Sequence, residues 1–352
     1  MDPNSLNAIK GAAGAGGGGG PDLIVGHEAW STPHMTAYPW TSGTGFGTKY
    51  ADPSSALSTG YDVCTDITFS PDGADLAIGH SNSPYITVYS WSSGFGTKYA
   101  NPSPLPTSIG VMGVAFSPDV ADLAVAHYGS PYVSVYPWSS GFGTKYSDPS
   151  TLPTGHGRMV AFSADGAYLA VGHTSSPYIS TYPWSSGFGT KYSDPSSLAP
   201  DTGTNVAFSP DGAAIALAHF GSPYISAWPW SPGFGTKYAN PGTLPTGVGY
   251  GVAFSPDGAD IALAHYSYSP YIVVYPWSSG SGFGTKYSDP STLPTGGAYK
   301  VAFSPDGADI AVVHSNSPYV SVYPWSSGFG TKYSDPSTLP TNDAKSVAFR
   351  PA

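Results

Sequence analysis

The chain has 352 residues, of which 10% are charged and 14% are aromatic, and its formal net charge is −10. Lys and Arg total only 12, which is too little positive charge for a phosphate-binding surface, so nucleic acid is excluded as a partner. A single cysteine, Cys64, excludes an intramolecular disulfide, and no apolar run approaches the roughly 18 residues of a transmembrane helix, so no membrane insertion is expected.

Residues 1–20 precede the repeated part of the chain and show neither the basic nor the apolar region of a secretory signal peptide. From Gly11 to Gly20 the segment contains only glycine and alanine, whose backbone entropy is too large to order without a partner. We therefore predict a flexible tail. The alternative is an anchor peptide that docks on another protein through Leu6, Ile9 and Lys10.

The stretch 206–238 shows best the unit from which the rest of the chain is built. An apolar run leads into Ser209-Pro210-Asp211-Gly212, in which proline and glycine favour the tight turn of a β-hairpin. A second apolar run follows, and then residues 224–228 alternate large and small side chains as a strand does. The aromatic, glycine-flanked segment 234–238 ends the unit. The pattern predicts four strands and three turns, and no window shows helical spacing.

Seven copies of this unit fill residues 21–352. Each copy contains Gly-Phe-Gly-Thr-Lys-Tyr, which begins at residues 45, 94, 141, 187, 233, 282 and 328. A repeat of 40 to 50 residues with four strands is typical of a β-propeller, in which each blade buries its apolar faces against its neighbours. We therefore predict an all-β, seven-bladed β-propeller with four antiparallel strands per blade.

The two ends of the chain are predicted to share the first blade. The last copy of the first-strand motif, at 347–349, has no strands after it, and the strand at 23–25 has no first strand before it. Residues 345–349 should therefore supply the inner strand of blade 1, and residues 23–50 its other three strands. The residues expected to close the ring are Leu23, Ile24, Val25, Val347, Ala348 and Phe349.

Three of these motifs resemble the WD-repeat β-propeller family: Val-Ala-Phe-Ser-Pro-Asp-Gly at 206–212, Leu-Ala-Ile-Gly at 76–79, and Val-Ser-Val-Tyr-Pro-Trp at 320–325. In that family the third strand ends in Trp-Asp, whereas Ser or Thr follows each tryptophan here, so the family's bridging network is not transferred. The tryptophans are Trp40, Trp91, Trp138, Trp184, Trp230, Trp277 and Trp325. The near-identical sequences of the repeats, such as residues 141–149, also resemble those of repeat proteins of marine bacteriophages.

Seven histidines recur at the end of the second strand, where they are expected to form a ring on one rim. They are His27, His80, His127, His173, His219, His265 and His314. Imidazoles converging on an axis bind metals, but neighbours one blade apart are too far from each other to share one ion at bonds of about 2 Å. We therefore expect each histidine to hydrogen-bond the next blade or the turn before Ser-Pro-Tyr, and expect no metal and no cofactor.

Other repeated groups have two interpretations each. The tryptophans suit either sugar stacking or packing between blades, and packing is favoured because they recur at one position of every blade. Asp-Pro pairs such as Asp148-Pro149 suit either calcium binding or turn initiation. A calcium site needs six or more oxygens from a compact loop, so turns are favoured.

Catalysis requires groups in different environments, so residues that break the repeat are the best candidates for it. They are Glu28, Trp30, His34, Cys64, His156, Arg158, Trp228 and the run Tyr266-Ser267-Tyr268. No nucleophile elbow, phosphate loop or zinc motif accompanies them. Sequence drift is the favoured explanation, and no catalytic residue is assigned.

Near-identical blades and the lack of a catalytic set lead to the hypothesis of a non-enzymatic structural or interaction module. Its specific form is a bacteriophage virion component, in the tail, a fibre or the capsid decoration, that contacts other virion proteins through the N-terminal tail. The alternative is a lectin-like propeller that binds cell-surface glycan for host recognition. An enzyme, the third hypothesis, would depend on His156, Arg158 or Glu28.

Overall fold

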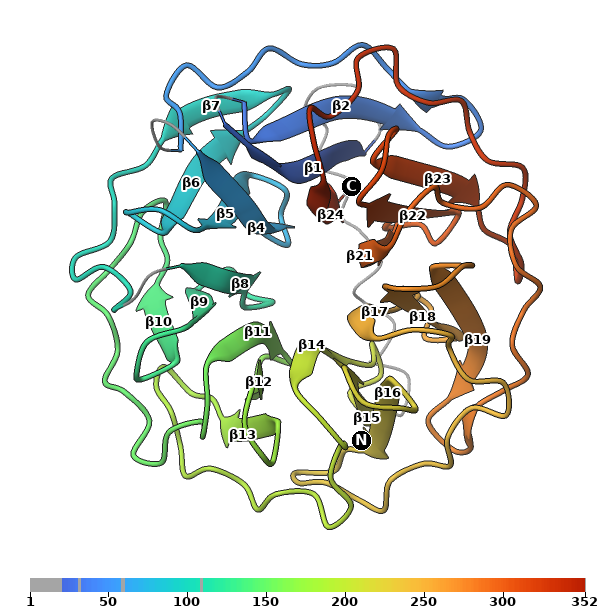
Figure 1. The fold of residues 1–352 in the computed structure, drawn as a ribbon. Coiled ribbons are helices and arrows are strands. Elements are labelled where there is room, and N and C mark those ends of the chain that lie inside the picture. The colour runs from blue at the N-terminus through green and yellow to red at the C-terminus, as the bar shows by residue number, and fades with distance from the viewer. Residues whose placement is uncertain (1–20, 31–32, 58–60, 108–109, 352) are drawn as a thin grey trace, which may run out of the picture.

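The computed structural model describes residues 21–351, except 31–32, 58–60 and 108–109. The predicted tail, with Leu6, Ile9 and Lys10, lies outside the described residues. All regular structure in the described part is β-strand, and the sheets stand around a common axis as the blades of a propeller (Figure 1).

Among the described residues the strands form seven blades, numbered 1 to 7 in the order in which each of the following lists runs. The inner strands, which face the axis, are β24 (Ala344–Phe349), β4 (Asp62–Phe69), β8 (Val111–Phe116), β11 (Gly157–Phe162), β14 (Gly203–Phe208), β17 (Gly249–Phe254) and β21 (Ala298–Phe303). The second strands are β1 (Asp22–Ala29), β5 (Asp75–His80), β9 (Asp122–His127), β12 (Tyr168–His173), β15 (Ala214–His219), β18 (Asp260–His265) and β22 (Asp309–His314). The third strands are β2 (Met35–Thr41), β6 (Ile86–Trp91), β10 (Val133–Pro137), β13 (Ile179–Pro183), β16 (Ile225–Pro229), β19 (Ile272–Ser278) and β23 (Val320–Pro324).

The fourth strand is a full strand only in some blades, which corrects the prediction of four strands throughout. It is present as β3 (Gly45–Phe46), β7 (Phe95–Lys98) and β20 (Gly282–Phe283). The other four described blades keep a single bridge, such as that between Trp138 and Phe142. The third strand usually carries a proline before its tryptophan, and proline donates no ladder hydrogen bond. Blade 2 has Ser90 there, and its fourth strand is the longest.

The predicted closure of the ring is confirmed. β1 pairs with β24 in antiparallel register, with Leu23 opposite Phe349 and Val25 opposite Val347. Past the end of β24, the Arg350 amide donates to the Asp22 carbonyl at 2.8 Å. Strands from the two ends of the repeated region therefore lie in one blade.

The predicted hairpin turn also forms. Gly212 has φ of +67°, in the left-handed region, and its amide donates to the Ser209 carbonyl at 2.9 Å. The Ser209 hydroxyl lies between Asp211 and the backbone of Ala214, to which it is bonded at 2.9 Å. In blade 3, Val120 occupies the glycine position with φ of +61°.

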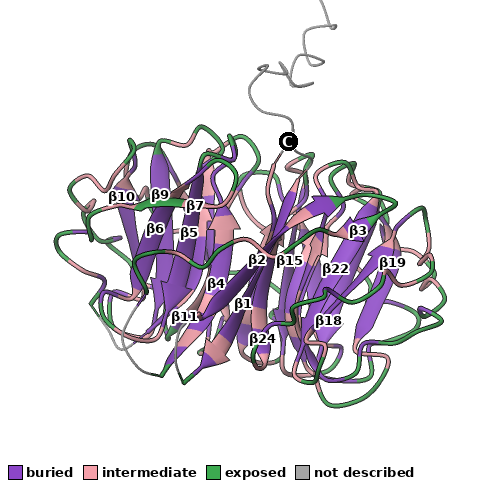
Figure 2. Cartoon of the chain, turned by 90° about the horizontal axis from the view of Figure 1, so that it is seen from above, coloured by how far each residue is buried: buried purple, intermediate pink, exposed green. Residues whose placement is uncertain are grey.

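The second strands lie deepest, and exposed residues collect in the loops at the two rims (Figure 2). The repeated tryptophans are at most 6% exposed, so the packing interpretation is confirmed. In the interface of blades 2 and 3, Trp138 Nε1 donates to Asp75 Oδ2 at 2.9 Å, and the Tyr99 hydroxyl donates to Asp75 Oδ1 at 2.8 Å. We call this arrangement the aspartate clasp.

A tryptophan donates to the clasp aspartate in five interfaces. The aspartates are Asp22, Asp75, Asp122, Asp260 and Asp309. Tyr168 and Ala214 replace the aspartate in the other two blades, and there the indole nitrogens of Trp230 and Trp277 are buried without a partner among the described residues. The tryptophans thus pair with an aspartate of the neighbouring blade's second strand.

Candidate functional site

Each inner strand has a β-bulge four residues before its final phenylalanine. In blade 3, Val111 is opposite His127 and Gly113 is opposite Ala126, so Met112 is an extra residue. A bulge redirects a side chain and often lies beside a binding site. The same shift occurs in all seven described inner strands, at Thr65, Met112, Arg158, Thr204, Tyr250, Tyr299 and Lys345.

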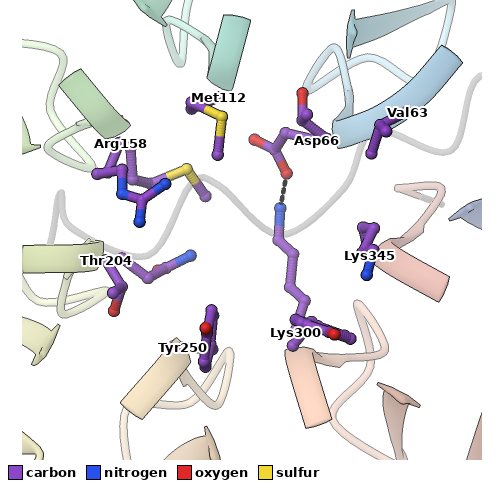
Figure 3. Close-up of a pocket in the computed structure, with 12 residues that line it drawn as sticks. Val63, Asp66, Met112, Arg158, Thr204, Tyr250, Lys300 and Lys345 are labelled. Atoms are coloured by element: carbon purple, nitrogen blue, oxygen red, sulfur yellow. Dashed lines mark hydrogen bonds and ion pairs between the residues drawn. The ribbon is translucent and has the colours of Figure 1, made fainter. Parts of the chain in front are cut away.

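These seven residues, which we call the bulge ring, line one pocket on the propeller axis. The pocket has a volume of about 240 Å³, and Figure 3 shows side chains from the surrounding strands pointing into it. Its remaining lining residues are Val63, Asp66, Met159, Asn205 and Lys300. Small-molecule pockets start at roughly 300 Å³, so this one suits a ligand of about the size of one sugar ring.

Lys300 and Asp66 form an ion pair in the pocket, and Lys300 extends across it to reach the carboxylate (Figure 3). The carboxylate also accepts hydrogen bonds from the Ser346 hydroxyl and the Val114 amide, each at 3.0 Å. Asp66 is therefore held in a fixed position, and the charge of Lys300 is compensated.

Lys345 lies on the side of the pocket opposite Arg158 (Figure 3). Its ammonium group is 4.0 Å from the centre of the Tyr299 ring and 3.4 Å from carboxylate oxygens of both Glu28 and Asp343. A cation over an aromatic face with two carboxylates nearby is well compensated.

Arg158 differs from both lysines. Its Nη1 donates to the Tyr128 hydroxyl at 2.9 Å, its guanidinium lies 5.9 Å from the Phe220 ring centre, and its Nε is buried without a hydrogen-bond partner. No carboxylate of the described residues forms an ion pair with it. The pocket therefore has one cation available to a negatively charged or strongly polarised ligand oxygen.

Tyr250 and Tyr299 form an aromatic wall with ring centres 5.3 Å apart. Burial raises the pKa of both hydroxyls above the usual value, so they stay protonated at neutral pH and can donate hydrogen bonds. The wall can cover the apolar face of a ring while its hydroxyls contact polar groups.

The repeated histidines lie inside the blades, away from this pocket. In six blades Nε2 is 3.0 to 3.1 Å from a Ser or Thr hydroxyl of the third strand, as between His127 and Ser134. In the seventh, Val273 replaces that residue, and neither nitrogen of His265 has a partner in the described part of the chain. Burial lowers the pKa of His127 and His265 to about 4. Among the described residues, no cluster of three or more potential metal ligands occurs.

Of the residues that break the repeat, Arg158 lines the pocket and Glu28 contacts Lys345 beside it. Trp228 has a structural role, because its Nε1 donates to the Ser197 carbonyl at 3.0 Å, as the equivalent tyrosines do in other blades. Cys64 is fully buried, and burial raises its thiol pKa. His156 bonds the Tyr128 carbonyl at the edge of the site.

The other repeat-breaking residues are divided between the surface and the interior. His34 is buried, whereas Trp30 and Tyr268 are exposed. Tyr266 packs on Tyr299 with ring centres 5.4 Å apart.

Sequence reasoning missed Asp66, Tyr250, Tyr299, Lys300 and Lys345. A signal for three of them, Tyr250, Tyr299 and Lys345, exists in the sequence. Counting back from the phenylalanine of each first strand, the second position is always Ile or Val, whereas the fourth changes from Thr to Met, Arg, Tyr and Lys. This variation marks the residues that meet at the axis.

No family profile matches the sequence, and no curated protein matches it. The fold resembles many solved structures. A Bacteroides uniformis protein provisionally named 6-phosphogluconolactonase is 16% identical, with TM-score 0.68, over 94% of this chain and 99% of that one. The periplasmic gluconolactonase PpgL of Pseudomonas aeruginosa is 16% identical, with TM-score 0.71 and the same coverage. A protein from Lactobacillus plantarum is 16% identical, with TM-score 0.75 and again the same coverage.

These similarities confirm the β-propeller and correct the functional hypothesis. Two of these three structures carry a functional name, and both names are lactonases. The expectation that this protein is a virion component and not an enzyme is therefore wrong. The hypothesis failed because the near-identical blade sequences were taken to mean that the protein has no functional site, whereas the residues that differ between blades lie at the axis. Within the described residues, no helix is long and apolar enough to cross a membrane. At 16% identity the similarity to these structures establishes the fold alone.

Proposed function

We propose that this chain is a hydrolase that opens a small lactone in the axial pocket. The observation that carries the proposal is the composition of the axial pocket, which holds one cation without a carboxylate partner, one fixed carboxylate and an aromatic wall. The names of the similar structures suggest gluconolactone and its 6-phosphate as the first substrates to test.

The pocket can supply the two parts of ester hydrolysis. Arg158 is suited to donate to the lactone carbonyl oxygen and to stabilise the negative charge that develops on it when water attacks. Asp66 faces this cation across the pocket and is suited to accept the proton of the attacking water. The carbon–ring oxygen bond then breaks, and the proton returns to the leaving oxygen. One lactone and one water give one hydroxy acid, with no other reactant.

Two further groups would orient the substrate. Thr204, beside Arg158 in Figure 3, and Asn205 line the pocket from β14 and offer a hydroxyl and an amide to the hydroxyl groups of a sugar lactone. The ion pair with Lys300 holds the Asp66 carboxylate in place for its role as a base.

The proposal is tested by proton release from gluconolactone and 6-phosphogluconolactone, measured against the spontaneous rate in the same buffer. Arg158→Met and Asp66→Asn should each lower kcat/KM about 100-fold or more, the effect of removing one oxyanion donor or a general base. Lys98→Met, which alters a cation of the outer strand β7, is the control and should keep the wild-type rate. The proposal fails if neither lactone is hydrolysed above the spontaneous rate, or if Arg158→Met hydrolyses it as the wild type does.

A further inference from the structure

Beside the pocket, two strands run further than their counterparts. β1 and β4 have eight residues each, whereas the six other second strands and the six other inner strands have six each. Their extra length lets them pair with each other, with Glu28 opposite Val63 and Ala29 opposite Asp62. This extension joins blades 1 and 2 next to the pocket, since Val63 lines it.

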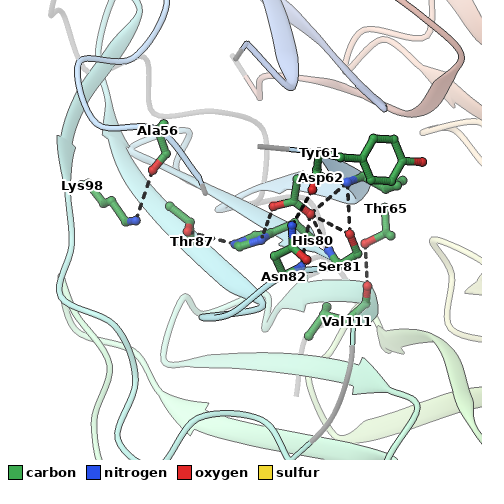
Figure 4. A network of polar contacts seen from close by, with 11 residues as sticks. Ala56, Tyr61, Asp62, Thr65, His80, Ser81, Asn82, Thr87, Lys98 and Val111 are labelled. Carbon is green, nitrogen blue, oxygen red and sulfur yellow. Dashed lines mark hydrogen bonds and ion pairs between the residues drawn. The ribbon is translucent and has the colours of Figure 1, made fainter. Parts of the chain in front are cut away.

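The next residues along this ladder are Trp30 and Tyr61, which we call the aromatic platform. Their ring centres are 4.5 Å apart, and they are 77% and 40% exposed. All eight other tryptophans are at most 6% exposed. Figure 4 shows Tyr61 on the same side of β4 as Thr65, a member of the bulge ring. The platform therefore continues the pocket wall outward into solvent.

The backbone at Tyr61 is held in place by neighbouring polar groups. The Asn82 side chain donates to the Tyr61 carbonyl at 2.6 Å. The Asp62 carboxylate accepts from the Ser81 amide at 3.0 Å and lies 3.1 Å from Nδ1 of the buried His80 (Figure 4). An exposed aromatic ring on a fixed backbone loses little entropy when it binds a flat surface, which is the property of a binding subsite.

The charges around the platform indicate a neutral ligand. Asp62 lies in the adjacent pair of the ladder and Glu28 in the pair after it, and Asp343 flanks the same lysine as Glu28 does. Burial, followed by the carboxylate of Glu28, raises the pKa of Tyr61, so its hydroxyl stays protonated. Carboxylates repel an anion here but accept hydrogen bonds from hydroxyl groups, while the rings cover an apolar face.

We propose that the aromatic platform is a second subsite that stacks on a neutral sugar ring attached to the lactone, so that the preferred substrate is a disaccharide lactone. This inference rests on the proposed hydrolase function and adds its substrate class. The lactone ring fills the axial pocket, which has room for about one ring, and the second ring lies outside on Trp30 and Tyr61.

The test compares gluconolactone with the lactone of a β-1,4-linked glucose disaccharide. The ratio of kcat/KM for the disaccharide lactone to that for gluconolactone should fall about tenfold in Trp30→Ala, the effect of losing one well-placed aromatic contact. Trp30→Phe should keep part of the preference. Tyr268→Ala removes another exposed aromatic, outside the pocket, and should leave the ratio unchanged.

Failure of this inference can be separated from failure of the proposed function. If both lactones are hydrolysed and Trp30→Ala leaves the ratio unchanged, the subsite is disproved and the hydrolase stands. If neither lactone is hydrolysed, calorimetric titration with the disaccharide aldonate decides. Binding that is present in the wild type and lost in Trp30→Ala supports the subsite, and equal binding by the two proteins overturns it.

Discussion

The contacts between blades and the bulge ring belong to the same repeats but have diverged to different extents. Between blades, the same tryptophan recurs seven times, and five aspartates receive its hydrogen bond. On the axis, the seven equivalent positions carry five different residue types. Conservation within one chain thus follows the packing surfaces, and variation follows the pocket.

The reason is symmetry. Every blade meets its neighbour in nearly the same geometry, so one set of residues serves every interface. A small ligand on the axis has no sevenfold symmetry, and each of its sides needs a different partner. A repeat protein can therefore build a chemically uneven site only by breaking its repeat, and the bulge lets it do so without disturbing the strand ladder on either side.

The largest effect we expect is a loss of folding stability at acidic pH, caused by the buried histidines of the blades. Burial lowers the pKa of His27, His127, His173, His219, His265 and His314 to about 4, from the ordinary 6.5. Between these values the unfolded chain binds protons that the folded chain does not, so stability falls as pH drops from 6.5 toward 4. Each histidine costs about 3 kcal/mol at pH 4, and several together exceed the usual total of ~5–15 kcal/mol.

Unfolding by urea, followed by circular dichroism from pH 8 to pH 4, measures this effect. The midpoint should be level above pH 6.5 and fall steeply below it. His265→Leu is the informative variant, because the ring nitrogens of His265 have no hydrogen-bond partner in the described structure. It should raise stability at pH 5 relative to the wild type. A midpoint independent of pH down to 4 would show that the buried histidines do not control acid stability.

The aspartate clasp gives the next largest effect. Asp75→Ala leaves the Trp138 indole and the Tyr99 hydroxyl without their acceptor in a buried interface, which should destabilise the fold by about 3 kcal/mol. Lactone hydrolysis at a temperature where the variant is folded should be unaffected, because Asp75 is remote from the pocket lining. The matched control is Asp148→Ala, which removes an exposed carboxylate paired with Lys145 and should change stability by under about 0.5 kcal/mol. Equal losses in the two variants would contradict the clasp.

The fold followed from the sequence because its signals are local and repeated seven times. The Ser-Pro-Asp-Gly turn, the periodic glycine and proline and the strand alternation all specify the same blade, and the unmatched strands at the two termini specified the closure between Val25 and Val347. Only the outer strand was overestimated, where proline removes a donor from the ladder.

The site was harder to predict, because its residues are defined by a shared position and not by a shared type. Arg158 was identified as a departure from the repeat, whereas Lys300 and Lys345 were not singled out in the sequence, although Lys345 lies at a bulge, Lys300 directly follows one, and both line the pocket. The ion pair between Lys300 and Asp66 joins residues 234 apart in sequence, and no local pattern indicates it. The repeated histidines drew attention because repetition is conspicuous, yet they serve the packing of the blades.

The smallest effect we expect is a gain in folding stability, at an interface between blades that lacks the aspartate clasp. Ala214→Asp places a carboxylate where Asp75 stands in blade 2, within reach of the Trp277 indole, which is now without an acceptor. Tyr238, equivalent to Tyr99, can add the second hydrogen bond by turning from the Ser279 carbonyl. Two bonds to a charged acceptor outweigh the cost of burying it by about 1 kcal/mol, which should raise Tm by about 2 °C. Ala216→Asp, on the same strand without such donors, should lower Tm sharply. If both variants lose stability alike, the five existing clasps owe their contribution to packing around the aspartate and not to its hydrogen bonds.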